Sequence, residues 1–141
     1  PGLVETTKSK QNVLGPKAME AGTSLARNYK GIKNKITKMH VFEEDMVSPE
    51  GGDDYFLFKI LKAKFVKKNF AAAVTDLKDF LSVHRDAAVQ CRATFYLGES
   101  YYFSHEYSKA LFHFLEVQDV YPELAKKWID SCLDLVEIKS E

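Results

Sequence analysis

From Tyr55 to Ile138 of the 141-residue chain, large apolar residues recur every three or four positions, and no stretch alternates with a period of two. This is the spacing of amphipathic helices, which place residues i, i+3 and i+4 on one face. Short breaks hold Asn69, Ser104 and Pro122, which interrupt or cap helices. The pattern predicts an all-α fold of antiparallel helical hairpins, with helices over 55–67, 69–83, 87–103, 107–120 and 123–138.

The formal charge of the whole chain is zero, because twenty Lys or Arg residues balance twenty acids. A neutral total argues against a protein that binds nucleic acid through bulk positive charge. No run of apolar residues approaches the roughly 18–20 that a membrane-spanning helix needs. Because the chain begins with Pro1 and not with Met, we expect that it has been processed or trimmed.

Charge is segregated within the first third of the chain. Eight Lys or Arg residues and one acid lie between Lys8 and Lys38, whereas six acids and no base lie between Glu43 and Asp54. Apolar residues in the basic stretch follow steps of four, three, four and three positions, which predicts one helical stripe of Leu25, Tyr29, Ile32, Ile36 and Met39. We therefore expect a flexible arm over 1–15, a basic amphipathic helix over 16–42 and a solvent-exposed acidic linker over 43–54.

Two of the predicted helices carry the same order of small and large residues. The stretch KKNFAAAVTDLKDFL, residues 67–81, aligns with SHEYSKALFHFLEVQ, residues 104–118, at an offset of 37 residues, so that Ala73 matches Ala110. Gly98 on the preceding helix is expected to let the second helix approach closely at Ala110. Each such hairpin leaves an apolar face that only a neighbouring hairpin can cover.

Residues 91–124 resemble a tetratricopeptide repeat, a helix–turn–helix unit of 34 residues. Trp128 lies 34 positions after Thr94, at the early Trp position of a following unit, and residues 54–87 form a weaker preceding unit. The resemblance implies about two and a half repeats over 55–141, stacked as a short solenoid behind the amphipathic helix. The matching positions are Leu97, Gly98, Tyr101, Tyr107, Ala110, Phe114 and Pro122.

The stretch YLGESYYFSHEYSKALFHFLEVQDVYP, residues 96–122, also has a narrower resemblance. It is similar to repeats of bacterial cell-envelope proteins, such as the lipoproteins and periplasmic proteins of outer-membrane assembly and of the Tol-Pal system. This resemblance implies a periplasmic or membrane-associated location in a bacterium and a place within a larger assembly.

In tetratricopeptide repeats, the first helix of each hairpin lines a concave groove that receives peptides or helices. Family members that bind the carboxylate tails of heat-shock chaperones have Lys and Asn on this wall, where this chain has Phe95 and Glu99. An amphipathic helix or an extended apolar segment is therefore the expected ligand. The resemblance implies a partner-binding groove formed by Tyr55, Phe58, Lys62, Phe65, Arg92, Phe95, Glu99, Tyr102, Phe103, Ile129 and Leu133, with Val136 near its end.

Two arrangements of this groove remain open. Its aromatic residues either form an exposed patch that marks a partner site, or the helix predicted over 16–40 covers them by lying in the groove or capping one end. Two and a half repeats are few for a solenoid, and capping by this helix, dimerisation or truncation would each remedy the shortage. If the helix packs there, deleting residues 1–42 lowers the melting temperature.

The sequence therefore predicts a non-catalytic scaffold for protein–protein interaction, which binds a protein or peptide partner and for which self-association is also open. The alternative is a membrane-surface adaptor in which residues 16–40 bind an anionic membrane. No nucleophile elbow, phosphate-binding loop or metal-ligand spacing of histidines occurs, so we expect no catalytic residue, cofactor or metal. Cys91 and Cys132 are expected to be buried reduced thiols, with a disulfide between them left open.

Overall fold

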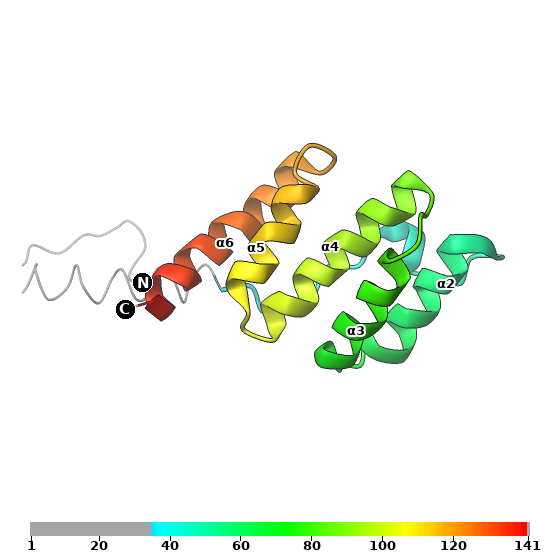
Figure 1. The fold of residues 1–141 in the computed structure, drawn as a ribbon, viewed down its shortest axis with the longest axis horizontal. Helices are drawn as coiled ribbons and strands as arrows, with labels where there is room; N and C mark the ends of the chain where they lie inside the picture. The colour runs from blue at the N-terminus through cyan, green and yellow to red at the C-terminus, as the bar shows by residue number, and fades with distance from the viewer. Residues whose placement is uncertain (1–34, 141) are drawn as a thin grey trace, which may run out of the picture. The chain divides into compact units, whose positions relative to one another are not determined.

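The structure, a computed structural model, describes residues 35–140. The chain divides into two compact units, Pro1–Lys33 and Asn34–Glu141, and every described residue belongs to the second. Five α-helices and no strand occur within 35–140, which confirms the predicted all-α fold for this part of the chain. They are α2 (Gly52–Ile60), α3 (Phe70–Leu81), α4 (Ala87–Phe103), α5 (Tyr107–Glu116) and α6 (Pro122–Ser140) (Figure 1).

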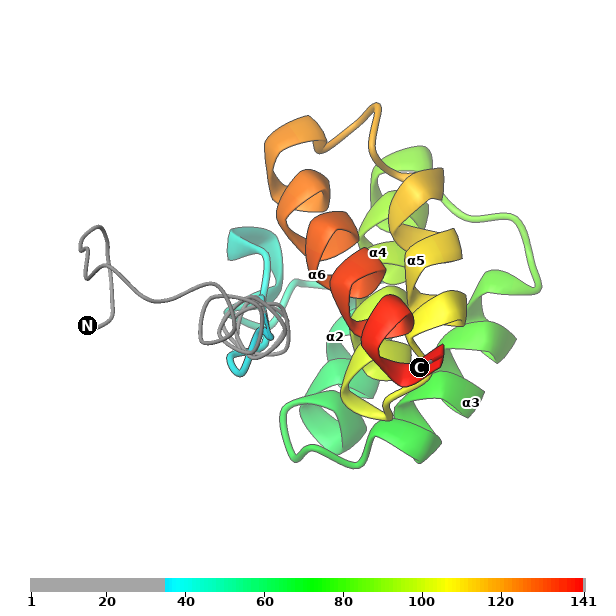
Figure 2. The ribbon, with the colours of Figure 1, turned by 90° about the vertical axis from the view of Figure 1, so that its left-hand side faces the viewer.

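The helices of the second unit pack against their neighbours in chain order. A π-helical turn, η2 (Leu61–Phe65), continues α2, and α2 then contacts α3 and α4. α4 packs between α3 and α5, and α6 packs on α5 (Figure 1). In Figure 2 the part of the chain before α2 that is drawn in cyan lies beside α2, α4 and α6, on the side that faces away from α3 and α5. α2, α4 and α6 therefore share one face, and the chain before α2 lies along it.

The two helical hairpins turn in the same way. Lys68, before α3, and His105, before α5, are the only non-glycine residues within 35–140 whose φ is positive, at 66° and 65°. In each turn the N–H of this residue donates to the carbonyl three positions earlier, and the next N–H donates to the carbonyl five positions before itself. Lys68 and His105 are 37 residues apart, so the repeat offset seen in the sequence recurs in the backbone.

Aromatic side chains from three helices form the centre of the core. Phe95 of α4 is fully buried, and its ring lies 5.0 Å from that of Phe114 on α5 and 6.0 Å from that of Trp128 on α6. Aromatic residues bury large apolar areas, so such contacts stabilise the packing of helices strongly. A Cβ added at Gly98 would lie 2.9 Å from a Phe114 ring carbon, so Gly98 makes room for this ring.

Two predicted boundaries differ from the structure. The helix expected over 16–42 does not continue through 35–42, where the chain is extended, whereas 16–34 lie outside the described residues, as does the arm over 1–15. The acidic linker expected over 43–54 is only partly in solvent, because it contains the 3-10 turn η1 (Glu43–Asp45) and Asp45 is 4% exposed. Both differences arise from contacts with α4 that are distant in sequence.

Candidate functional site

One face of α4 carries the polar side chains of the candidate site. Arg92, Tyr96, Glu99 and Tyr102 are spaced by four, three and three positions, so they follow one another along one side of the helix. All four are buried, with exposed fractions from 0% for Tyr96 and Glu99 to 3% for Arg92. They are covered by residues 36–45, which run along α4 as an extended chain ending in η1, and which we call the groove segment.

Side chains of α4 bind the main chain of the groove segment at three points. Because contacts with later residues of the segment fall on earlier residues of α4, the segment runs antiparallel to the helix. A bend at Lys38 separates the first bound position from the other two. The N–H of Ile36 donates to the Tyr102 hydroxyl (2.7 Å), that of His40 to Glu99 Oε1 (2.6 Å) and that of Phe42 to the Tyr96 hydroxyl (2.8 Å).

A buried ion pair fixes the end of the groove segment. Arg92 Nε lies 3.0 Å from Asp45 Oδ2, and Arg92 Nη2 lies 3.3 Å from Asp45 Oδ1, which is the two-point geometry that favours guanidinium–carboxylate pairs. The Tyr96 hydroxyl donates to Asp45 Oδ2 at 2.7 Å, and Arg92 also pairs with Asp54 of α2. Burial alone would lower the pKa of Arg92, but the two carboxylates outweigh it and raise this pKa above its ordinary value. The guanidinium of Arg92 therefore keeps its charge.

Phe42 is the aromatic anchor of the groove segment. Its side chain is 8% exposed, and its ring lies 4.8 Å from that of Tyr121, 5.4 Å from that of Phe95 and 5.6 Å from that of Tyr96. These edge-on and tilted contacts are favourable arrangements for aromatic pairs. Phe42 contacts the ring of Tyr96 and Asp45 accepts from its hydroxyl, so both residues anchor the segment at Tyr96.

The middle of the groove holds polar atoms without a protein partner. Glu99 Oε2 and His40 Nε2 are buried and form no hydrogen bond with the described residues. Burial raises the pKa of Glu99 well above its ordinary value, and the His40 N–H and the charge of Lys127 lower it only in part. Burial and Lys127 lower the pKa of His40. Neutral forms of both side chains are therefore favoured.

Helix α6 closes the other side of the groove. Ser131 Oγ is 2.6 Å from the Tyr102 hydroxyl, which also accepts the Ile36 N–H, so this hydroxyl joins α6 to the segment. Burial raises the pKa of Tyr102, which keeps the hydroxyl protonated. Trp128 of the same helix is 1% exposed, and its Nε1 has no partner among the described residues.

The structure brings part of the predicted groove together. Arg92, Glu99 and Tyr102 contact the groove segment directly, and Phe95 packs on Phe42. The remaining predicted residues vary in exposure: Phe65 and Ile129 are buried, Tyr55, Phe58, Phe103 and Val136 are half-buried, and Lys62 and Leu133 are exposed. The first of the two open arrangements, an exposed aromatic wall, is thus not found at α4, because the chain itself covers it.

Sequence reasoning missed four residues that contact the occupant of the groove or belong to it. Tyr96 follows Phe95 directly, and a helical pattern alone does not tell which of two adjacent aromatics faces the groove. Asp45 is one of six acids in a stretch that resembles a solvated linker, so nothing in its local sequence distinguishes it. Phe42 and His40 lie in the stretch predicted as the end of a helix. The contacts that identify all four residues join parts of the chain that are distant in sequence, so no local pattern predicts them.

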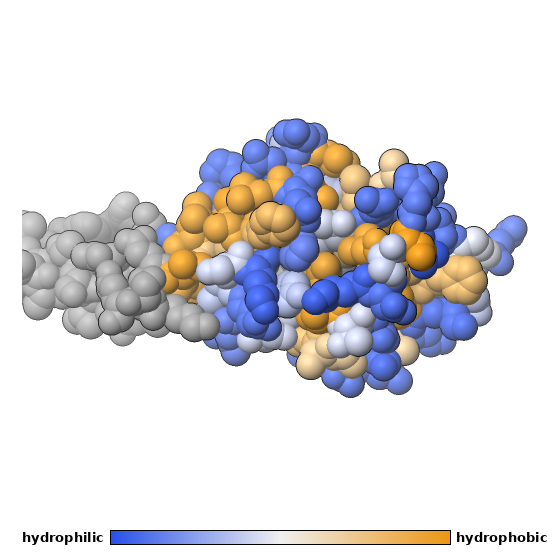
Figure 3. Space-filling view, viewed as in Figure 1, coloured by the Kyte–Doolittle hydropathy of each residue, from blue (hydrophilic) through white to orange (hydrophobic). Residues whose placement is uncertain are grey.

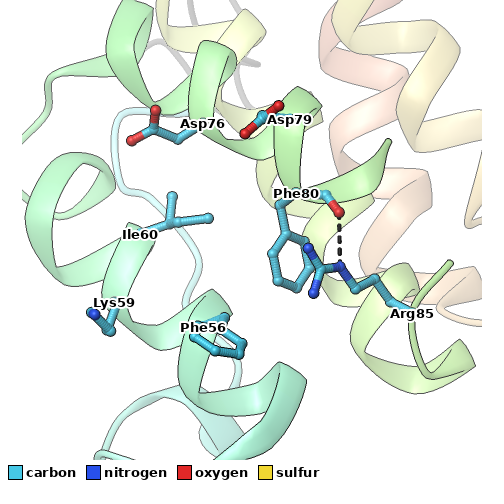
Figure 4. Close-up of a pocket in the computed structure, with 7 residues that line it drawn as sticks. All are labelled: Phe56, Lys59, Ile60, Asp76, Asp79, Phe80 and Arg85. Atoms are coloured by element: carbon cyan, nitrogen blue, oxygen red, sulfur yellow. Dashed lines mark hydrogen bonds between the residues drawn. The ribbon is translucent and has the colours of Figure 1, made fainter. Parts of the chain in front are cut away.

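A second hollow of about 390 Å³ lies between α2 and α3 on the outer side of the first hairpin (Figure 4). Phe56, Ile60 and Phe80 form its apolar floor, and the Phe80 carbonyl accepts a hydrogen bond from Arg85 Nε at 2.8 Å. Its charged side chains balance, because Lys59 and Arg85 face Asp76 and Asp79. The hollow therefore favours neither a positive nor a negative ligand. Phe56 is 52% exposed and lies outside the groove, so its substitution is a suitable control.

Further apolar surface is visible over α5 and α6 (Figure 3). The exposed large apolar residues of these two helices are Phe112, Leu115 and Leu133. Both cysteines are free, and burial raises the pKa of Cys132 to about 12. No helix within 35–140 is long and apolar enough to cross a membrane. In the same range, no cluster of His, Cys, Asp or Glu is placed to hold a metal ion.

Comparison of the chain with protein-family models, with curated proteins and with solved structures gives no match.

Proposed function

We propose that this chain is a non-catalytic scaffold for protein–protein interaction, whose groove along α4 binds an extended peptide segment. The groove is occupied by residues 36–45 of the same chain. Its occupant is therefore the second kind of ligand that the sequence suggested, an extended segment with apolar anchors.

The observation that carries this proposal is the binding of main-chain N–H groups by side chains of α4. In a permanently folded core, backbone N–H groups are mostly bound by backbone carbonyls of helices or sheets. Here three backbone N–H groups are bound by the side chains of Tyr96, Glu99 and Tyr102. These bonds are not part of the backbone hydrogen bonding of α4. A surface that binds an extended main chain through its side chains is suited to peptide recognition.

A tetratricopeptide-repeat architecture is part of the proposal. It is supported by the sequence match over 91–124, by the repeated hairpin turn at Lys68 and His105, and by the full burial of the paired residues Ala73 and Ala110. The resemblance of residues 96–122 to envelope repeats supports a place in a bacterial cell envelope. The hydroxyls of Tyr96 and Tyr102 and the guanidinium of Arg92 are engaged with the groove segment, which supports binding over catalysis.

The proposal is tested by offering the groove segment as a separate molecule. Phe42→Ala and Asp45→Asn, combined in the full-length chain, remove both anchors of its own segment and leave α4 unchanged. A fluorescent peptide of residues 35–47 should then bind saturably, as measured by fluorescence anisotropy. The wild-type chain should bind it at least about tenfold more weakly, because its own segment competes at a high effective concentration.

Phe56→Ala, added to the double variant, is the matched control, because it removes an exposed aromatic side chain outside the groove and should not change peptide affinity. Far-UV circular dichroism establishes that each variant is folded. A folded double variant that fails to bind the peptide would show that the groove does not recognise extended segments.

A further inference from the structure

We propose that the groove selects partner proteins by an extended segment in which an aromatic residue precedes an aspartate by three positions, and that residues 36–45 are an internal competitor with this chemistry. This inference rests on the proposed function and specifies its ligand. The partner segment carries the equivalents of Phe42 and Asp45 and leaves most other positions free.

The side chains of the groove segment differ in exposure. Ile36, Phe42 and Asp45 are buried, at 9%, 8% and 4% exposed, and Met39, His40 and Val41 are half-buried. Thr37, Lys38, Glu43 and Glu44 point into solvent, although they belong to the same bound segment. Of the three buried side chains, Phe42 is the aromatic one and Asp45 the charged one, so the groove selects its ligand most sharply at these two positions.

The spacing of three follows from the 3-10 turn. The Asp45 N–H donates to the Phe42 carbonyl at 2.9 Å, which closes one turn and brings both side chains to Tyr96. The hydroxyl of Tyr96 accepts the Phe42 N–H and donates to the Asp45 carboxylate. The hydroxyl of this one residue of α4 therefore bonds both anchor residues. An anchor pair with a different spacing would lose one of these two hydrogen bonds.

The groove segment is joined to the helices by an exposed linker. Met46 and Val47, which follow it, are 64% and 73% exposed, and the linker runs only to the start of α2 at Gly52. α4 keeps its packing against α3 and α5 whether or not the segment is present, because the segment lies on the opposite side (Figure 2). The segment can therefore leave without separating the helix pairs.

The fit of the internal segment is incomplete. Glu99 Oε2 and His40 Nε2 are buried at the contact without a hydrogen-bond partner among residues 35–140. Buried polar atoms without a hydrogen bond weaken the state that contains them. A partner segment that supplies a hydrogen-bond partner to Glu99 Oε2 binds more tightly than residues 36–45 do, which allows it to displace them despite their high effective concentration.

The test compares two substitutions that remove the same charge from the peptide. Full-length chain carrying Phe42→Ala and Asp45→Asn is titrated with labelled peptides of residues 35–47. Asp45→Asn and Phe42→Ala in the peptide should each weaken binding at least about tenfold, whereas Glu44→Gln should change it less than about twofold. In a full-length chain that also carries Arg92→Gln, the difference between the wild-type and Asp45→Asn peptides should shrink, and the double-mutant cycle measures the share that Arg92 contributes, while the Tyr96 hydroxyl still donates to Asp45.

Each outcome has one meaning. If the wild-type peptide does not bind a folded variant, the proposed function fails and this inference fails with it. If it binds, but Asp45→Asn weakens binding no more than Glu44→Gln does, the selectivity proposed here is wrong and the groove remains a peptide site. Wild-type dimers that dissociate on Asp45→Asn substitution, seen by light scattering, would assign the groove to a second copy and overturn the proposal. If the double variant is unfolded, the same peptide titrations are made with the full-length chain that carries Asp45→Asn alone.

Discussion

At the scale of single residues, Glu99 links the groove to pH. Its carboxyl group is fully buried, with one oxygen bound by the His40 N–H at 2.6 Å and the other without a protein partner. Burial raises its pKa well above the ordinary 4.5, so the folded chain keeps this proton to a higher pH than the unfolded chain does. The contribution of Glu99 to stability is therefore complete below that ordinary value and declines as pH rises above it.

Glu99→Gln is expected to remove this decline. The amide oxygen can still accept the His40 N–H, but the side chain cannot ionise. The free energy of unfolding of the variant relative to wild type should therefore increase between about pH 5 and pH 9. Urea denaturation at several pH values measures it, and the titration of His40, which is present in both proteins, cancels in the comparison. A difference that is constant with pH would contradict the assigned role of Glu99.

The partner of Arg92 could not be predicted from the sequence. Arg92, which the sequence predicts to line a groove, is buried, and its partner Asp45 lies 47 positions away in an acidic stretch that resembles a linker. Local patterns contain no information on which of six acids will meet a buried guanidinium. A buried ion pair is decided by tertiary geometry, because only excellent geometry offsets the cost of removing both charges from water.

At the scale of helices and turns, the contact of Gly98 with Phe114 determines how closely α4 and α5 pack. Gly98→Ala should gain about 1 kcal/mol of helix propensity, but its Cβ would lie 2.9 Å from the buried Phe114 ring. Overpacking of this kind costs typically about 1–3 kcal/mol, so we expect a net loss of stability. Thermal denaturation measures it, and the loss should shrink when Phe114→Leu provides room. A stabilised single variant would contradict the close contact.

The turns between helices offer a change in the opposite direction. Lys68 is exposed and has a φ of 66°, a conformation in which side chains other than glycine are strained. Lys68→Gly should therefore stabilise the chain by roughly 0.5–1 kcal/mol. Lys67→Gly, at a neighbouring exposed position without a positive φ, is the matched control and should not stabilise it. Equal effects of both substitutions on the urea midpoint would show that the strain at Lys68 is negligible.

Helices were more predictable than the segment that covers them. The prediction of a helix over 87–103 coincides with α4, which is buried on every side over residues 95–102. The helix expected over 107–120 ends at Glu116, since the N–H of Val117 donates three positions back to Phe114 and starts a turn. Residues 35–42 have helical spacing but are extended, because α4 supplies acceptors for their N–H groups.

At the scale of the whole described unit, the central claim is that α4 binds an extended segment and that the chain fills this site itself. The measurement that tests it most directly is amide hydrogen exchange of the full-length chain, resolved by NMR. The N–H groups of Ile36, His40 and Phe42 are bound by α4, whereas no such bond engages those of the exposed Thr37 and Lys38.

We predict that the three bound amides exchange at least about tenfold more slowly than those of Thr37 and Lys38, once intrinsic rates are taken into account. In the full-length Arg92→Gln variant, this protection should fall while amides within α4 stay protected, since the segment loses an anchor and the helix does not. Glu44→Gln should leave all protection unchanged. Equal, fast exchange across residues 36–42 in a wild-type chain with protected helices would contradict a groove filled by its own segment.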